Sequence, residues 1–452
     1  MLTQSLRVKL ETVKKLIRRN ARHPLENLLT KLHPADIASI YKNLSDLEKE
    51  KIWNYISDKS IVASAVLELE DSDIINFFEN RAIKEILPII DEMESDDAAD
   101  IVRMLPDDMT HELLKAMGKD EMSEVETLLT YPEDTAGAIM NTGFFALNED
   151  LTVKEATKTL HQAKDIEMVF YLYVVDSEEK LTGVLSLRQL ILNPPDTHLS
   201  EIMSRDIIKV QTDVDQEDVA KMVERYDLLA VPVVDEDYRL CGIITVDDVI
   251  DIIREEATED IYRMAGTSDD ELLFGHNSAK VARVRLPWLL ITFFGSLLSG
   301  VVVAYFQGSI TEFALLVPFM PVIMAMAGNV GSQSATILIR GVALGKINHA
   351  DMVRVTFKEI RVGAIIGLTC GLLLAVVGYL VDGTVVMGLA VGVSMLCSLT
   401  IAAFTGAFVP ATLIKMNFDP AVASSPFITM LNDIIGLAVY FGTAVTFFRY
   451  LG

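Results

Sequence analysis

The sequence predicts a multi-domain protein: an all-α superhelical N-terminal domain, a tandem α/β repeat, a long linking helix, and a transmembrane domain of five α-helices. Three observations predict this order. Charge is divided unequally along the 452 residues, an internal repeat occupies positions 137–250, and five long uncharged runs follow Arg285. The predicted boundaries are 1–131 for the helical domain, 132–247 for the repeat, 248–280 for the linking helix and 281–452 for the membrane domain.

The net charge of −25 is the sum of two unlike parts of the chain. Residues before position 280 include 58 acidic and 29 basic side chains, whereas the remainder includes 6 acidic and 10 basic ones. Because the acidic part would repel a phosphate backbone, we expect no binding to nucleic acid. Three cysteines without CxxC spacing indicate neither a disulfide framework nor a zinc site. HExxH, GxxxxGK[ST] and GxSxG motifs are missing, so we expect no enzyme.

Residues 1–131 are predicted to be helical throughout. Apolar residues recur at helical spacing in DIASIYKNLSDLEKEKIWNYI (36–56) and in DAADIVRMLPDDMTHELLKAM (97–117). Both stretches contain Ala-Asp-Ile near their start, so they resemble copies of one helical hairpin, and stacked hairpins form a short superhelix. The first 20 residues are charged and lack an apolar run, so we expect no secretory signal and a cytoplasmic location for this part.

Two copies of an α/β unit follow. The first contains GAIMNTGFFALNEDLTVKEA, YVVD and LTGVLSLRQL, and the second contains SEIMSRDIIKVQTDVDQEDVA, PVVD and LCGIITVDDV. Short β-rich runs alternate with amphipathic helical stretches, which favours a small sheet in each copy. The pair resembles tandem CBS domains, and the resemblance implies a sensory module that can bind an adenine nucleotide. The residues that match that nucleotide site are Gly242, Thr245, Asp248 and Arg188. The first copy has Gln189 where the family pattern has an acid or asparagine.

The next stretch, VDDVIDIIREEATEDIYRMAG (246–266), is helical in pattern and among the most acidic of the chain. It joins the repeat to the first uncharged run, so we expect it to report the state of one domain to the other.

The five uncharged runs are each long enough to cross about 30 Å of hydrocarbon as a helix. They occupy about 287–306, 313–339, 362–381, 384–414 and 426–448. Nine lysines and arginines lie before the first run or in alternate loops, and the loops around Glu312 and Asp382 have none. This asymmetry predicts a multi-pass protein of the bacterial plasma membrane, with the N-terminal domains in the cytoplasm and the C-terminus outside.

Asp433 is the only carboxylate inside these five runs. An unpaired carboxylate in hydrocarbon is costly unless it faces water, a cation or a hydrogen-bonding partner. The second run contains Asn329, Gln333 and Thr336 at i, i+4 and i+7, which places a polar stripe on one helical face. Oxygen ligands with a single carboxylate suit a hard cation that keeps most of its water, so Mg²⁺ is the expected ion. A protonated aspartic acid that joins two helices is the structural alternative.

The whole order resembles the MgtE family of bacterial magnesium transporters, most specifically in GNVGSQSAT (328–336), DPAVASSPF (419–427) and LNDIIG (431–436). The resemblance implies a homodimer in the lipid bilayer, with a pore at the subunit interface and the linking helix as a plug. It implies three pore residues, Asp433, Asn329 and Asp419. It also implies regulatory Mg²⁺ ligands at Asp91, Asp96, Glu217, Asp227, Asp248, Asp251, Glu256 and Glu259.

The charge pattern agrees with this resemblance, because divalent cations that bridge facing carboxylates would relieve the repulsion within the acidic part. We therefore expect Mg²⁺ to be both the substrate and a ligand that closes the pore from the cytoplasm, with ATP as a possible ligand of the CBS pair. Three alternatives stay open from the sequence. They are a membrane receptor for metal or adenine nucleotide that does not transport, a broader divalent-cation transporter that also carries Co²⁺, Mn²⁺ or Ni²⁺, and a membrane metalloprotease, for which the motifs are missing.

Overall fold

The computed structural model describes residues 4–162, 171–268, 278–306, 308, 314–348, 350–416, 418–420 and 425–451. The chain divides into two compact units, residues 1–255 and 256–452, and each is described by itself. Glu312 and residues 421–424 of the DPAVASSPF stretch lie outside the described residues.

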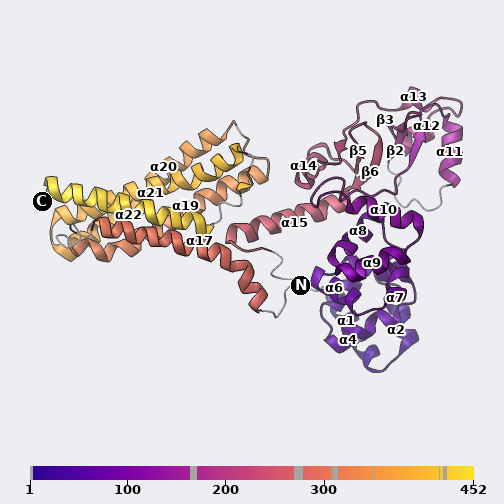
Figure 1. The fold of residues 1–452 in the computed structure, drawn as a ribbon, viewed down its shortest axis with the longest axis horizontal. Coiled ribbons are helices and arrows are strands. Elements are labelled where there is room, and N and C mark those ends of the chain that lie inside the picture. The colour runs from indigo at the N-terminus through magenta and orange to yellow at the C-terminus, as the bar shows by residue number, and fades with distance from the viewer. Residues whose placement is uncertain are drawn as a thin grey trace. The chain divides into compact units, whose positions relative to one another are not determined.

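The first unit begins with ten short α-helices, as the apolar spacing predicts (Figure 1). These are α1 (Gln4–Arg18), α2 (Arg22–Leu29), α3 (Pro34–Tyr41), α4 (Asp46–Ile52), α5 (Lys59–Leu67), α6 (Asp71–Glu79), α7 (Ile83–Ile90), α8 (Ser95–Met104), α9 (Asp107–Ala116) and α10 (Lys119–Leu129), with a 3-10 turn η1 (Trp53–Tyr55). Helix α3 packs on α5, α5 on α7 and α7 on α9, while α6 packs on α8 and α8 on α10. Helices two apart in sequence therefore stack, which is the arrangement of a superhelix.

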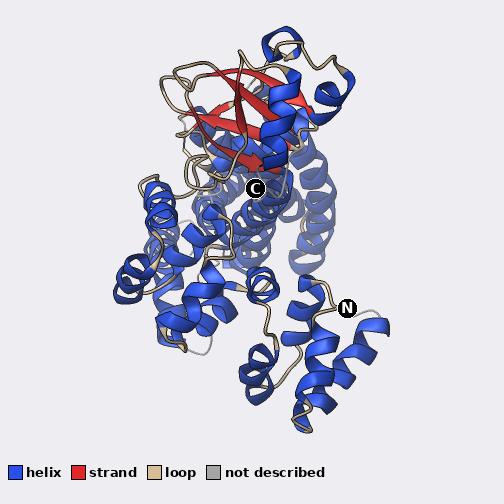
Figure 2. Ribbon diagram, turned by 90° about the vertical axis from the view of Figure 1, so that its right-hand side faces the viewer, coloured by secondary structure: helices blue, strands red, loops and turns tan. Residues whose placement is uncertain are grey.

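The two repeats fold into two three-stranded sheets, which are the strands of Figure 2. The first repeat contains β1 (Ala146–Asn148), α11 (Val153–Gln162), β2 (Tyr171–Val175), β3 (Leu181–Ser186), α12 (Leu187–Leu192) and α13 (Leu199–Ile202). The second contains β4 (Val210–Gln211), α14 (Gln216–Tyr226), β5 (Ala230–Val234) and β6 (Leu240–Thr245), and α15 (Val246–Ala265) follows it. In each sheet the first pair of strands is parallel and the second antiparallel.

The two repeats contact each other at Gly183 and Gly242, which occupy matching positions in LTGVLSLRQL and LCGIITVDDV. A Cβ atom on Gly242 of the second repeat would collide with Met140, at 2.8 Å, in the segment ahead of β1 of the first repeat. A Cβ atom on Gly183 of the first repeat would overlap Met203, in the segment ahead of β4 of the second. Each glycine thus lets the lead-in segment of the other repeat cross its strand, and the two repeats form one module.

The second unit contains five helices that are long and apolar enough to cross a membrane. They are α17 (Ser278–Tyr305), α19 (Met320–Ala343), preceded by the 3-10 segment η2 (Ala314–Phe319), α20 (Met352–Asp382), α21 (Val385–Lys415) and α22 (Ser425–Leu451). Helix α21 is the most buried of the five and packs on α19, α20 and α22, while α17 packs on α22 (Figure 1). The predicted runs are found in the predicted order, and α17 and α20 begin about two to three turns earlier than the uncharged runs do.

That early start of α20 corrects one expectation. Glu359 lies outside the uncharged run, yet it belongs to α20 and is only 2% exposed within the described residues. Its carboxylate accepts a hydrogen bond from the Ser334 hydroxyl of α19 at 2.9 Å. The five helices therefore contain a buried carboxylate in addition to the half-buried Asp433, because the charged first turns of α20 continue into the bundle.

Candidate functional site

Asp433 lies on α22 and lines a cavity of about 450 Å³ in the second unit. The cavity is formed by α22, α17 and the last residue of α15. Its lining residues are Ala265, Thr292, Ser296, Ser425, Pro426, Thr429, Met430 and Asp433. Among the described residues that line the cavity, Asp433 is the only one with a charged side chain, and the other polar side chains are hydroxyls.

The hydroxyls on α22 are tied to α19 beside this cavity. Ser425 Oγ donates to Ser332 Oγ at 3.0 Å, and Ser332 Oγ lies 3.2 Å from Thr429 Oγ1. Close helix packing makes this possible, because a Cβ atom on Gly328 of α19 would lie 2.9 Å from the Thr429 methyl group. Ser332 of GNVGSQSAT therefore ties α22 to α19 beside Asp433.

The polar stripe that the sequence predicts on α19 does not line this cavity. Asn329, Gln333 and Thr336 are all exposed in the single chain, and none of them lines the cavity beside Asp433. The shared face that the spacing predicts is present, but within one chain it is not joined to Asp433. The role of Asn329 in an ion path therefore stays a prediction.

Three hydroxyl residues of the cavity, Thr292, Ser296 and Thr429, were not singled out from the sequence. Thr292 and Ser296 belong to α17, which the sequence presents as a plain uncharged run. A signal for them exists, since Thr292, Ser296 and Ser299 recur at i, i+4 and i+7. Only the packing of α17 on α22 shows that this stripe is beside Asp433 and not in lipid.

Asp419 and Glu259 are both held by one arginine. Arg263, in the last turn of α15, makes ion pairs with Glu259 on its own helix and with Asp419 ahead of α22. A second tie joins Asp260 of α15 to Arg340 of α19 at 4.0 Å. The end of α15 also packs by Met264 against an apolar cluster of α19 and α22, so it is anchored beside the cavity that Ala265 lines.

In the first unit, carboxylates of α8 face the start of α15. Burial and the neighbouring charges of Asp248 and Asp97 raise the pKa of Asp96 well above its usual range. Burial, Asp248 and Glu94 raise the pKa of Asp97 to about 7. Asp96 is 6% exposed, and its Oδ1 atom has no hydrogen-bond partner among the described residues. The structure thus brings together two of the predicted regulatory acids, Asp96 and Asp248.

The other predicted regulatory acids are not gathered there. Glu217 pairs with Lys221 at 2.9 Å, Asp251 lies 3.7 Å from Arg254, and Asp227 ends α14 in a left-handed conformation. Asp91 ends α7, where burial and the charge of Glu121 raise its pKa. Glu256 acts electrostatically on Arg263. Within the described residues, no three histidine, cysteine or acidic side chains lie close enough to hold a metal ion.

The residues predicted for an adenine nucleotide have local structural roles. Asp248 accepts hydrogen bonds from the hydroxyl and the amide of Thr245, at 2.5 and 3.3 Å, and so caps the start of α15. Gln189 has the same role in the first repeat, where it accepts from Ser186. Arg188 is exposed on α12. Capping therefore explains the Thr-x-x-Asp spacing with or without a nucleotide.

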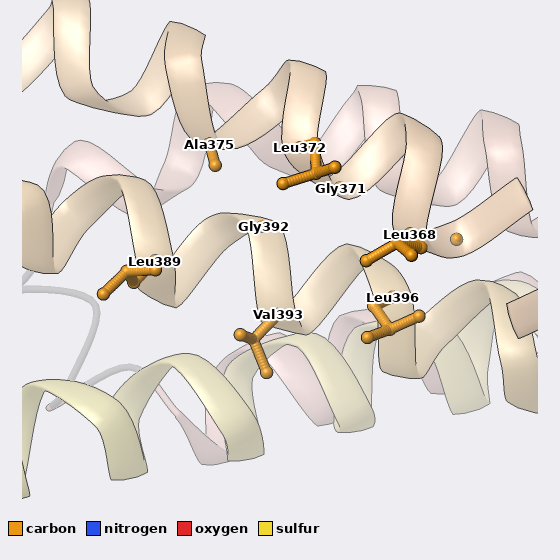
Figure 3. A pocket seen from close by; sticks show the side chains of 9 residues that line it. Leu368, Gly371, Leu372, Ala375, Leu389, Gly392, Val393 and Leu396 are labelled. Atoms are coloured by element: carbon orange, nitrogen blue, oxygen red, sulfur yellow. The ribbon is translucent and has the colours of Figure 1, made fainter. Parts of the chain in front are cut away.

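A second hollow, between α20 and α21, differs in kind from the cavity of Asp433. It measures about 90 Å³ and is lined only by glycine, alanine, valine and leucine residues, among them Gly371 and Gly392 (Figure 3). It offers no side-chain ligand for a cation, and it results from close glycine packing of the two helices.

Comparisons with known proteins agree with this division. Models of the divalent cation transporter domain of MgtE, of the MgtE intracellular N domain and of the CBS domain match residues 320–443, 32–134, and 136–194 with 199–255. The magnesium transporter MgtE of Bacillus subtilis is 34% identical over 96% of both chains. This chain belongs to the MgtE family. The MgtE of Thermus thermophilus is also 34% identical, over 93% of this chain and 94% of that one.

Solved structures of MgtE cytosolic parts resemble the first unit. The soluble part of a magnesium transporter aligns with a TM-score of 0.51 and 33% identity, over 56% of this chain and 99% of that one. The cytosolic domain of the Mg²⁺ channel MgtE in complex with ATP aligns with a TM-score of 0.52 and 32% identity, over 54% and 99%. The predicted fold, a helical N domain followed by a CBS pair and five membrane-length helices, is therefore confirmed, and the MgtE family is a transporter family, not an enzyme family.

Proposed function

We propose that this chain transports Mg²⁺ across a bacterial plasma membrane along a path that passes Asp433. One observation carries the proposal: the charged group of the membrane unit that the sequence singled out lines a cavity whose other polar groups are hydroxyls. The relatives named magnesium transporters, matched over nearly the whole chain, support the same ion.

The size and chemistry of the cavity suit a hydrated ion. Six waters at about 30 Å³ each occupy about 180 Å³, which a cavity of about 450 Å³ accommodates with its central cation. Mg²⁺ loses water reluctantly and prefers oxygen ligands. Oxygen ligands select weakly between hard divalent cations, so transport of Co²⁺, Mn²⁺ or Ni²⁺ is the alternative that competition must test.

The working form that we infer is a homodimer whose ion path runs between the subunits. Asn329, Gln333 and Thr336 form an exposed amide and hydroxyl stripe on a membrane-length helix. Such a face is costly in lipid and is satisfied by water or by a second protein surface. A partner subunit against this stripe would give Asn329 a place beside the path. The excess of lysine and arginine on one set of loops supports a cytoplasmic first unit.

Regulation is proposed to act through the acidic residues. Burial, together with the charge of the nearby Asp248, raises the pKa values of Asp96 and Asp97, and a divalent cation would relieve the repulsion from Asp248. Glu256 and Glu259 are the corresponding acids in the second unit, and Asp419, which pairs with Arg263 as Glu259 does, is the proposed pore acid ahead of α22. The remaining candidates are Asp91, Glu217, Asp227 and Asp251. Mg²⁺ bound to these acids would hold the linking helix α15 in the position that closes the ion path. ATP at Gly242, Thr245 and Arg188 would modulate this closure.

The transport proposal is tested with purified protein in liposomes that contain a fluorescent Mg²⁺ indicator. Asp433→Asn should abolish uptake, while Asp382→Asn, which removes a half-buried carboxylate at the end of α20, should leave it unchanged. Co²⁺, Mn²⁺ and Ni²⁺ are added as competitors. Full uptake by Asp433→Asn would refute the path. Absence of uptake by the wild-type protein, together with retained Mg²⁺ or ATP binding, would favour the receptor.

The regulatory proposal has its own test. Protease protection of the first unit is titrated with Mg²⁺ from micromolar to tens of millimolar in the full-length protein. Protection should rise with Mg²⁺, and Asp248→Asn should shift the midpoint upward. Asp237→Asn, an exposed acid in the turn between β5 and β6, is the control. Protection that does not change with Mg²⁺ would contradict cation-dependent closure.

A further inference from the structure

The wall of α17 beside Asp433 carries two hydroxyls one turn apart. Thr292 and Ser296 both line the cavity, opposite Ser425 and Thr429 of α22. The two helices are in close contact at this level, because a Cβ atom on Gly295 would overlap the Met430 side chain. Thr292 and Ser296 therefore face the cavity because of how α17 packs on α22.

Two of the four hydroxyls in this wall, those of Thr292 and Ser425, donate their protons to protein acceptors. Thr292 Oγ1 donates to the backbone carbonyls of Trp288 and Leu289, at 3.1 and 3.0 Å. Ser425 Oγ donates to Ser332 Oγ at 3.0 Å. A hydroxyl has one proton and two lone pairs, so these oxygens meet the cavity as acceptors. Ser296 has no hydrogen-bond partner among the described residues and can turn its lone pairs inward too.

A wall of hydrogen-bond acceptors complements a hydrated cation. The waters around a divalent cation bind the metal through their oxygens and direct their protons outward, so the hydrated ion is a donor on all sides. Mg²⁺ gives up this shell reluctantly. A dehydrated cation would instead take the Asp433 carboxylate and the hydroxyl oxygens as direct ligands, so two cations that hold their water differently separate the two cases.

We propose that Thr292 and Ser296 are specificity-determining residues of the ion path, which accept hydrogen bonds from the water shell of Mg²⁺ as it sits beside Asp433. The inference rests on the proposed function and deepens it, because it assigns the recognition of the hydrated ion to α17. It explains why the uncharged run of α17 presents hydroxyls to the cavity that Asp433 lines.

The test measures uptake of Mg²⁺ and of Co²⁺ into liposomes by Thr292→Val, Ser296→Ala and the double variant. Each single change should raise the KM for Mg²⁺ about fivefold, as loss of one hydrogen bond does, with kcat changed less than twofold. Co²⁺ gives up water more readily, so its KM should rise less and the preference for Mg²⁺ over Co²⁺ should fall. Thr292→Ser restores the hydroxyl and should behave as wild type.

Thr369→Val is the matched control. Thr369 on α20 makes the same bond to a carbonyl four residues earlier, that of Ile365, at 3.0 Å, but it is exposed on the bundle surface. The variant should leave both KM values unchanged. Ser296→Ala removes a single oxygen, so it keeps the test open if Thr292→Val does not fold.

The outcomes separate the inference from the transport proposal. If Asp433→Asn is inactive while the double variant keeps the wild-type KM and the wild-type preference for Mg²⁺, the acceptor wall is refuted and the path stands. If Asp433→Asn transports normally, the path itself fails. Equal losses for Mg²⁺ and Co²⁺, with the loss in kcat instead of KM, would assign Thr292 and Ser296 a packing role and overturn the inference.

Discussion

Arg263 and Asp419 form an ion pair, with 2.5 Å between Nη1 of the arginine and Oδ2 of the aspartate, that joins the end of α15 to the segment ahead of α22. Arg263 also pairs with Glu259. Two carboxylates that the family resemblance implies as Mg²⁺ ligands therefore share one cation of the chain itself. Mg²⁺ must compete with a guanidinium that is already in place.

Arg263→Gln should release the end of α15 when divalent cations are absent. Glutamine keeps much of the length but cannot bridge two carboxylates with charge. In a background without the three native cysteines, Ala265→Cys and Met430→Cys, which line one cavity, should cross-link readily in wild type and slowly in Arg263→Gln. Added Mg²⁺ should restore the rate. Lys415→Gln is the control, and an unchanged rate in Arg263→Gln would show that the ion pair does not hold α15.

Gly331→Ala should destabilise the membrane unit. A Cβ atom on Gly331 of α19 would overlap the side-chain amide of Asn432 on α22, beside Asp433, and would lie 3.3 Å from the carbonyl of Ala402 on α21. Overpacking of this kind costs about 1–3 kcal/mol. Thermal unfolding in detergent should show a lower Tm. Uptake into liposomes should show weaker Mg²⁺ transport. Gly300→Ala on α17, whose Cβ would meet nothing within 4 Å, should leave the Tm equal or higher.

Glu359 should act through its hydrogen bond with Ser334. Glu359→Gln keeps a carbonyl oxygen as acceptor for the serine hydroxyl and should retain most of the Tm and of the uptake. Glu359→Leu leaves the buried Ser334 hydroxyl without its acceptor, which costs about 1–3 kcal/mol. Both variants are compared by thermal unfolding in detergent. If glutamine is as harmful as leucine, the negative charge of Glu359 is required and the hydrogen bond alone is insufficient.

The first unit should become more stable as pH falls from 8 to 5.5 without divalent cations. The folded-state pKa of Asp97 is raised to about 7 and that of Asp100 to about 6, both above the ordinary value, so the folded state binds more protons than the unfolded one. Their contribution to stability is complete at low pH and is lost as pH rises through these values. The result should be a higher Tm at pH 5.5.

This pH dependence can be followed in one unit of the full-length protein. The chain has two tryptophans, so Trp288→Phe leaves Trp53 of the first unit as the reporter. Asp97→Asn should remove most of the difference in Tm between pH 5.5 and 8, and Asp237→Asn should preserve it. A wild-type Tm that rises with pH over this range would contradict the assigned pKa directions.

Much of the architecture was predictable because it depends on local patterns. Apolar spacing predicts the superhelix and the five membrane helices, and the aligned glycines Gly183 and Gly242 predict the two repeats. Asp433 could be singled out for the same reason, since an isolated carboxylate in an uncharged run is visible without a fold. Glu359 could not, because charged residues surround it in sequence and only the bundle buries it.

The sequence by itself determined the order of domains, the division of charge and the family resemblance, and it singled out Asp433 as the candidate pore residue. The tertiary structure alone decided which side chains share a space with it. Thr292 and Ser296 lie about 140 residues from Asp433, Arg263 meets Asp419 across more than 150 residues, and Asn329 faces outward instead. Periodicity specifies the face of a helix on which a residue lies. The partner of that face depends on helix packing, which is set by close contacts such as those at Gly295 and Gly331.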